Sequence, residues 1–380
     1  MRSFVRQFNF PTLIRWGEGA SSEIPDHLLT ENLRCPLVVV DPKTASASFF
    51  NELIRDLNSR TLHPEVFNVF GSFLTEHIAK DGVSHFKNSG CDCIIAVGNA
   101  TALSAGRAIA FFNQHQEPVE FYDEAHGGEK NVIHPLPHFI TVPVAAGGNE
   151  AARTIELRNE ITLEKSVIFS PSLMAKVIFA DPITTRECNG KEIREWKMVS
   201  YSTLVESWFS LMHHPICEGI ALEGLSLLHE SEKNIDHPGD TRDLELLMLA
   251  SLMSGIASQK GLGLHAAITD AISACSGCAR GLAGALLFDP VMRFSLEQNQ
   301  PAAMKFSQRL GWREKSHEAI INKIISWPAH LALPSRLSEI GLYAADLEVI
   351  VAMVVEDPIH AQGPRPVTRS EIRSILSNVL

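Results

Sequence analysis

Residues 93–112 read CIIAVGNATALSAGRAIAFF, an apolar run joined to a helical pattern through Gly98. Residues 93–97 carry no charge, which is typical of a strand buried on both faces of a parallel sheet. From residue 101 the apolar spacing becomes helical and predicts a helix over 101–114. The stretch therefore predicts a strand–turn–helix unit of an α/β fold.

The rest of the first half repeats this unit. PLVVVD at 36–41 and HFITVPV at 138–144 predict two more buried strands, and residues 46–59 predict a helix. We therefore expect a doubly wound, mostly parallel sheet. After Asp181-Pro182 the apolar spacing stays near 3.6, and it predicts helices over 198–212, 217–230, 242–259, 263–287, 301–311 and 316–327. The boundaries expected are an α/β domain over 1–182 and an all-helical domain over 183–380, with a small-molecule cleft between them.

Composition limits the partners. The 380 residues carry a formal charge of −11 with no Lys/Arg cluster, which argues against nucleic acid and anionic membranes. Without a signal-like N-terminus, and with seven cysteines in no regular framework, the chain is expected in the cytoplasm. The pair Cys275 and Cys278 suggests half of a zinc or redox site, but no matching second pair exists, so we expect ordinary thiols.

Several segments resemble one family, the iron-dependent (group III) alcohol dehydrogenases. The resemblance is carried by FPTLIRWGEGASSEIPDHL (10–28), SPSLMAKVIFADP (170–182), LVESWFSLMHHPICEGIALEGLSLL (204–228) and GPRPVTRSEIRSIL (363–376). It implies a dehydroquinate-synthase-like fold, a Rossmann-like dinucleotide-binding domain followed by a helical one, NAD(P)-dependent oxidoreduction and a homodimer.

The resemblance also implies a metal site, and here the sequence departs from the family. Four family ligands, an aspartate and three histidines, hold Fe²⁺ or Zn²⁺. The matching positions of this chain hold Val199, Thr203, Ala266 and Arg280. Valine and alanine offer no lone pair and a guanidinium repels a cation, so we expect no metal.

Three residues near the lost ligands are candidates for catalysis. Arg280 stands at a former ligand position and can polarise a substrate oxygen or bind a carboxylate in place of the metal. Asp270, at the position of a further family histidine, can exchange protons. His265 is either a polar group of the site or a satisfied core histidine. The alternative for Asp270 and Arg280 is an ion pair that only fills the space of the metal.

Cofactor residues are also altered. The family's glycine-rich phosphate loop appears as Gly98-Asn99-Ala100-Thr101, in which Ala100 adds a methyl group where a phosphate approaches. Asp41 is expected to bind the adenosine ribose hydroxyls and to favour NAD over NADP, or else to cap a helix. The other expected cofactor contacts are Val144 and Ala145, at the positions of two family threonines, and Lys165.

These residues favour a metal-independent NAD(P)-dependent oxidoreductase that acts on a small alcohol or carbonyl compound. Two alternatives stay open. One is a non-redox enzyme on the same scaffold, a lyase, isomerase or cyclase, because a fold alone does not fix the chemistry. The other is a catalytically silent binding subunit.

Overall fold

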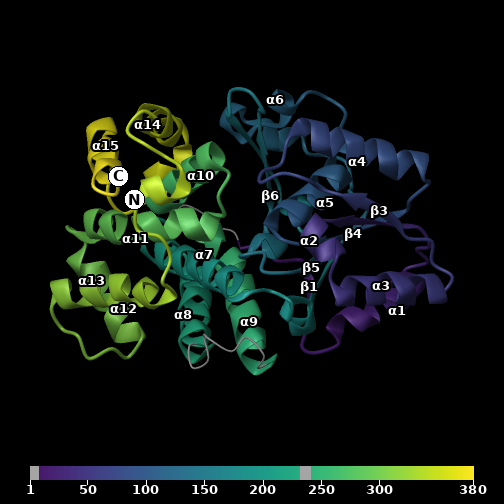
Figure 1. The fold of residues 1–380 in the computed structure, drawn as a ribbon, viewed down its shortest axis with the longest axis horizontal. Coiled ribbons are helices and arrows are strands. Elements are labelled where there is room, and N and C mark those ends of the chain that lie inside the picture. The colour runs from purple at the N-terminus through teal and green to yellow at the C-terminus, as the bar shows by residue number, and fades with distance from the viewer. Residues whose placement is uncertain (1–7, 232–240) are drawn as a thin grey trace. The chain divides into compact units, whose positions relative to one another are not determined.

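The computed structural model describes residues 8–231 and 241–380 (Figure 1). These residues form two compact units. An α/β unit falls within Asn9–Asn189 and Asp236–Leu252, and a helical unit falls within Met1–Phe8, Gly190–Ile235 and Met253–Leu380.

A six-stranded sheet is the centre of the α/β unit. All its pairings are parallel, in the order β1-β8-β5-β4-β2-β3. The three strands expected from the sequence are confirmed as β2, β4 and β5, and nearly all their residues are buried. The bounds are β1 Leu13–Trp16, β2 Pro36–Val40, β3 Glu65–Asn68, β4 Cys93–Gly98, β5 His138–Pro143 and β8 Val177–Ala180.

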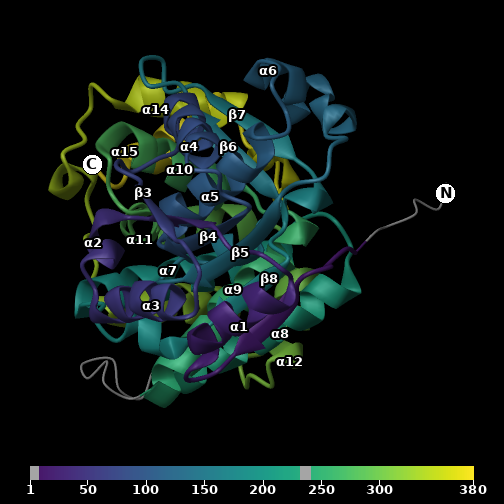
Figure 2. The ribbon, with the colours of Figure 1, turned by 90° about the vertical axis from the view of Figure 1, so that its right-hand side faces the viewer.

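Helices cover both faces of this sheet, so the doubly wound α/β prediction is confirmed. On one face α1 (Ile24–Thr30) and α3 (Ser48–Ser59) bury Leu28, Phe50 and Leu57 against alternate strand residues. On the other face lie α4 (Glu76–Asn88) and α5 (Ala100–Phe112), as Figure 2 shows. The unit also contains α2 (Pro42–Ala45), α6 (Val119–Tyr122) and an antiparallel pair, β6 (Thr154–Arg158) with β7 (Lys165–Phe169).

The helical unit is built from long helices, as expected, with one correction. The single helix predicted over 263–287 is wrong, because the chain breaks after Ser276, where Gly277 adopts a left-handed φ of 70°. Ala279 is extended and a new helix begins at Arg280. The bounds are α7 Gly190–Phe209, α8 Pro215–Glu230, α10 Leu264–Ser276, α11 Arg280–Leu296, α12 Gln300–Arg309, α13 His317–Ser326, α14 Leu347–Glu356 and α15 Arg369–Ser377. The remaining long helix, α9 (Thr241–Ala257), belongs to the α/β unit up to Leu252 and to the helical unit from Met253.

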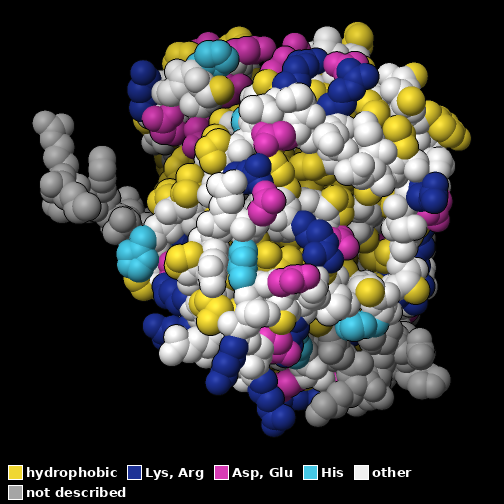
Figure 3. Space-filling model, turned by 90° about the vertical axis from the view of Figure 1, so that its left-hand side faces the viewer, with side chains coloured by type: hydrophobic (Ala, Val, Ile, Leu, Met, Phe, Trp, Pro, Cys, Tyr) yellow, Lys and Arg dark blue, Asp and Glu magenta, His cyan; other side chains and the backbone are white. Residues whose placement is uncertain are grey.

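The described helices include none with the length and apolarity needed to cross a membrane. On the face drawn in Figure 3, acidic and basic side chains are interspersed among apolar ones. None of the seven cysteines, all of them in the described residues, forms a disulfide, and Cys275 and Cys278 are half-buried.

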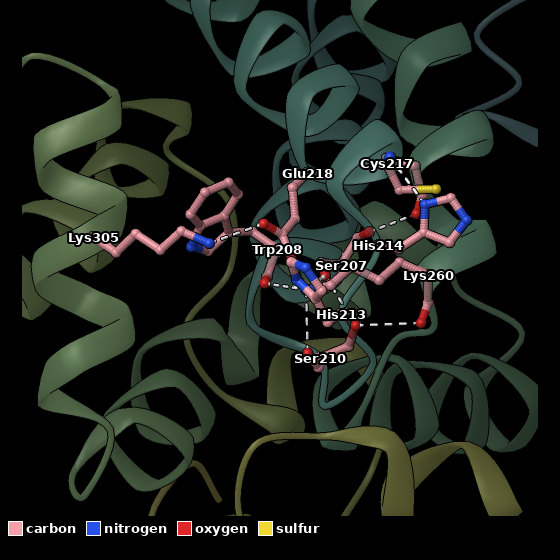
Figure 4. Close-up of polar contacts among 10 residues, drawn as sticks. Ser207, Trp208, Ser210, His213, His214, Cys217, Glu218, Lys260 and Lys305 are labelled. Carbon is pink, nitrogen blue, oxygen red and sulfur yellow. Dashed lines mark hydrogen bonds and ion pairs between the residues drawn. The ribbon is translucent and has the colours of Figure 1, made fainter. Parts of the chain in front are cut away.

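Lys260 closes the C-terminal end of α7 (Figure 4). Its side chain is buried, and its Nζ donates to the carbonyl oxygens of Ser207 at 3.0 Å, Ser210 at 3.1 Å and Trp208. Glu218 Oε1 lies 3.7 Å from the same nitrogen. An ammonium at a helix C-terminus satisfies carbonyls that have no partner within the helix and complements the helix dipole.

We predict that Lys260→Met lowers the free energy of unfolding by about 2 kcal/mol, because it removes the ammonium that donates to the carbonyl oxygens of Trp208 and Ser210. Lys305→Met is the matched control. Lys305 also pairs with Glu218, but its side chain is 47% exposed, so its loss costs under about 1 kcal/mol. Urea unfolding of both variants measures the difference, and equal losses would contradict the role given to Lys260.

Candidate functional site

The loops that follow β2, β4 and β5 lie at neighbouring positions on the carboxyl edge of the sheet. The chain passes from β2 to β3 on one side and returns to β4 on the other side of β2. Such a reversal opens a crevice at the carboxyl ends of the two strands, where ligands of doubly wound folds bind. Asp41, after β2, and Gly98, which ends β4, are placed at this edge.

Asp41 ties these two strand ends together. Its carboxylate accepts from Thr44 N at 3.0 Å and from Thr44 Oγ1 at 2.8 Å, so it caps α2. It also accepts from Asn99 N at 3.1 Å. Gly98 has a φ of 134°, and a Cβ there would lie 2.2 Å from Asp41 Oδ2. The capping alternative expected for Asp41 is therefore present, and its contact with a ribose stays a prediction.

The N-terminus of α5 keeps donors for an anion. Asn99 Oδ1 accepts from Ala102 N at 3.1 Å. In the part of the chain that the structure describes, the N–H groups of Ala100 and Thr101 have no protein partner. Free first-turn N–H groups of a 13-residue helix suit a phosphate. A dinucleotide pyrophosphate therefore fits this edge, although the Thr101 hydroxyl itself donates to Ser72 O at 3.4 Å.

The loop after β5 lies beside that helix start. Val144 N donates to Gly98 O at 2.8 Å, which places the two loops together. Ala145 has a φ of 51°, and Gly147 and Gly148 also have positive φ values. Lys165 begins β7, which belongs to the two-stranded sheet and not to the six-stranded one, and its contact with a cofactor stays a prediction.

In the helical unit, the structure brings Asp270 and Arg280 together. The two form an ion pair between α10 and the first residue of α11. The side chain of Asp270 is 5% exposed, whereas that of Arg280 is 41% exposed. The break at Gly277 makes this pairing possible, since ten residues along one continuous helix would separate the two side chains by about 15 Å.

His265 is the satisfied core histidine of our two interpretations. It is 2% exposed, and its Nε2 lies 2.8 Å from the carbonyl oxygen of Gly284, which accepts a hydrogen bond from it. Burial lowers its pKa to about 4, so the ring is neutral at pH 7. The Nε2 proton is committed to α11, which leaves the catalytic role expected for His265 without support from this geometry.

Glu206 is the residue of this site that our interpretation of the sequence missed. Its carboxylate accepts from His265 N at 2.7 Å and from Ala266 N at 3.0 Å, so it caps the start of α10 from α7. Gly263 leaves the necessary room, because a Cβ there would lie 3.0 Å from Glu206 Oε1. A buried acid among the apolar residues of 204–209 was the available signal.

The side chains at the four family metal-ligand positions are poor ligands for a metal ion. Among residues 8–231 and 241–380, no group of three or more His, Cys, Asp or Glu side chains is placed to hold one. Val199, Thr203 and Ala266 offer at most one weak donor, and Arg280 brings a positive charge to the fourth position.

We predict that Glu206 makes stability depend on pH. Burial raises its pKa to about 7, so in the folded protein it is protonated at pH 5 to 6, where the unfolded chain has lost the proton. Below about pH 4.3 the titration of Glu206 does not change the free energy of unfolding. As the pH rises from there to 7, that free energy falls by roughly 3 kcal/mol.

The measurement is urea unfolding at several pH values for the wild type and Glu206→Gln. Subtracting the two profiles isolates Glu206 from other buried acids such as Glu150, whose pKa burial also raises to about 7. Parallel profiles between pH 5 and 7 would refute the prediction.

Two family models match the two halves of the chain. Residues 11–182 match the family model "Iron-containing alcohol dehydrogenase", and residues 202–380 match "Fe-containing alcohol dehydrogenase family, C-terminal". A 4-hydroxybutyrate dehydrogenase of Cupriavidus necator is 23% identical, over 94% of this chain and 95% of the relative.

Solved structures share the fold. An alcohol dehydrogenase from Oenococcus oeni superposes with a TM-score of 0.92 at 19% identity, over 99% of this chain and 100% of that one. A sulfoacetaldehyde reductase from Bifidobacterium kashiwanohense, solved in complex with NAD⁺, gives 0.84 at 19% identity and covers 99% of each chain.

Proposed function

Because the chain belongs to the iron-containing alcohol dehydrogenase family, we propose that it is a metal-independent, NAD-dependent oxidoreductase of small alcohols or carbonyl compounds. The observation that carries this proposal is the ion pair of Arg280, which stands at a family metal-ligand position, with Asp270. The oxidoreductase class follows from the family. The metal independence rests on the chemistry of the substituted side chains.

Arg280 is proposed to take over the electrostatic work of the metal. In alcohol oxidation, hydride leaves the carbinol carbon and a proton leaves its oxygen, so negative charge develops on that oxygen. A fixed cation that donates hydrogen bonds there stabilises this charge. Asp270 keeps the guanidinium in place and is the candidate to take the proton.

The carboxyl edge of the sheet is proposed to hold the cofactor. Bound NAD⁺ supplies the hydride acceptor. The N–H groups of Ala100 and Thr101 bind its pyrophosphate, with Val144 and Ala145 in the adjoining loop. Asp41 disfavours the 2′-phosphate of NADP by charge repulsion. We also propose, from the sequence, that Lys165 contacts the cofactor and that the protein is a cytoplasmic homodimer.

The proposed substrate class is a short alcohol or aldehyde, including those with an anionic end. The relatives above act on 4-hydroxybutyrate and sulfoacetaldehyde by their names, and both compounds carry an anionic group. A guanidinium suits such a group through bidentate hydrogen bonds.

We predict that the wild type binds NAD⁺ and NADH more tightly than NADP⁺, by fluorescence titration, and oxidises or reduces members of an alcohol and aldehyde panel. Turnover is expected to survive dialysis against a chelator, with less than stoichiometric iron and zinc by elemental analysis. Failure of every dinucleotide to bind at millimolar concentration overturns the proposal in favour of a silent subunit. Binding without hydride exchange favours a non-redox enzyme, and a stoichiometric metal refutes metal independence.

A second prediction distinguishes a catalytic role of Arg280 from an ion pair that only fills the space of the metal. Arg280→Met is expected to lower kcat/KM by about 100-fold, as the loss of one oxyanion donor does. It also lowers the melting temperature, since Asp270 stays buried without its partner. The double variant Arg280→Met/Asp270→Asn restores the melting temperature but not the activity.

The matched control is Arg293→Met, because Arg293 also forms an ion pair on α11, with Asp289 at 2.6 Å, but with both side chains exposed. It is expected to keep both activity and stability. Recovery of activity in the double variant would show that Arg280 only neutralises Asp270.

A further inference from the structure

Arg107 is a fully buried cation of α5 that the proposed chemistry does not use. Burial lowers its pKa to about 10, so it stays charged at neutral pH. A buried charge is costly unless its hydrogen bonds are directed at specific partners. Two of those bonds go to one residue, Asn149, in the loop that follows β5.

Arg107 holds Asn149 with two hydrogen bonds. Arg107 Nη2 donates to the Asn149 carbonyl oxygen at 2.6 Å, and Nη1 donates to Asn149 Oδ1 at 3.2 Å. Nη1 also lies 3.4 Å from the carbonyl oxygen of Thr154. The planar guanidinium therefore fixes both the main chain and the side chain of Asn149.

Ser104, one helical turn before Arg107, completes this grip. Asn149 Nδ2 donates to Ser104 Oγ at 3.1 Å, and the same hydroxyl lies 3.3 Å from Asn149 Oδ1. From α9, Ser251 Oγ accepts from Gly148 N at 3.0 Å and donates to Glu150 Oε1 at 3.2 Å. Three consecutive loop residues, Gly148, Asn149 and Glu150, are thus each held by a side chain of a helix.

The held loop has a backbone that needs such support. Ala145 has a φ of 51°, a left-handed conformation that is sterically unfavourable for an alanine. Gly147 and Gly148 follow with φ values of 61° and 90°. A strained conformation of this kind persists only where its surroundings determine it.

We propose that Arg107 and Ser104 are positioning residues for the dinucleotide, which act through Asn149 to hold the loop 144–148 beside the N-terminus of α5. This inference rests on the proposed function, because it assumes that a dinucleotide binds at that edge. Because the loop is already ordered, binding of the dinucleotide does not have to supply the free energy of ordering it.

The test is the dissociation constant of NADH, measured by fluorescence titration, for the wild type, Ser104→Ala, Asn149→Ala and the double variant. These changes keep the buried Arg107 and its hydrogen bond to the main-chain carbonyl oxygen of residue 149. We expect Asn149→Ala to weaken NADH binding by about tenfold and Ser104→Ala by about threefold. The double variant is expected to bind NADH as weakly as Asn149→Ala alone, because Asn149→Ala already removes the interaction with Ser104.

Asn58→Ala is the matched control, since Asn58 is exposed on α3 and donates only to its own helix, to Ile54 O at 2.8 Å. It is expected to bind NADH as the wild type does. Melting temperatures measured alongside separate positioning from stability. A wild type that binds NADH, with Asn149→Ala within twofold of it, overturns the inference even if the melting temperature falls. A wild type that binds no dinucleotide fails the proposed function instead.

Discussion

The ion pair between Asp270 and Arg280 is the constraint on which the helical site depends. A carboxylate that is 5% exposed needs a cationic partner, and the break after Ser276 brings that partner to the start of the next helix. Glu206 fixes the start of α10 by accepting two of its first N–H groups. The helix is thus held at its first residues and at Asp270 in its middle, close to the positions where the family resemblance implied a metal.

The α/β unit uses the same device of buried polar side chains that join elements far apart in the sequence. Asp41 connects the ends of β2 and β4, and Arg107 connects α5 to the loop after β5. Both residues are buried, so their hydrogen bonds are not exchanged for bonds to water. They fix the backbone at the carboxyl edge, where we propose that the pyrophosphate of the cofactor binds.

The fold is shared with the family even though the side chains at the implied metal positions differ. TM-scores above 0.8 at about 19% identity show a common fold, and a fold alone does not carry a reaction. An arginine supplies fixed positive charge and directed donors, but no open coordination position. The proposed chemistry is therefore electrostatic, and it places the demand for precise geometry on two helices and the turn between them.

The sequence by itself determined the buried strands, the doubly wound class and the family, because uninterrupted apolar runs and motif spacing are local properties that survive divergence. It also identified Arg280 and Asp270 as neighbours of the lost metal position. The tertiary structure alone decided that these two residues pair, that Gly277 divides the predicted helix, and that His265 is committed to the carbonyl of Gly284. It also showed that Glu206 caps the start of α10 and that Asn149 links the loop after β5 to α5. Those roles depend on partners 42 to 60 residues away, and no local pattern specifies which distant donor a buried side chain meets.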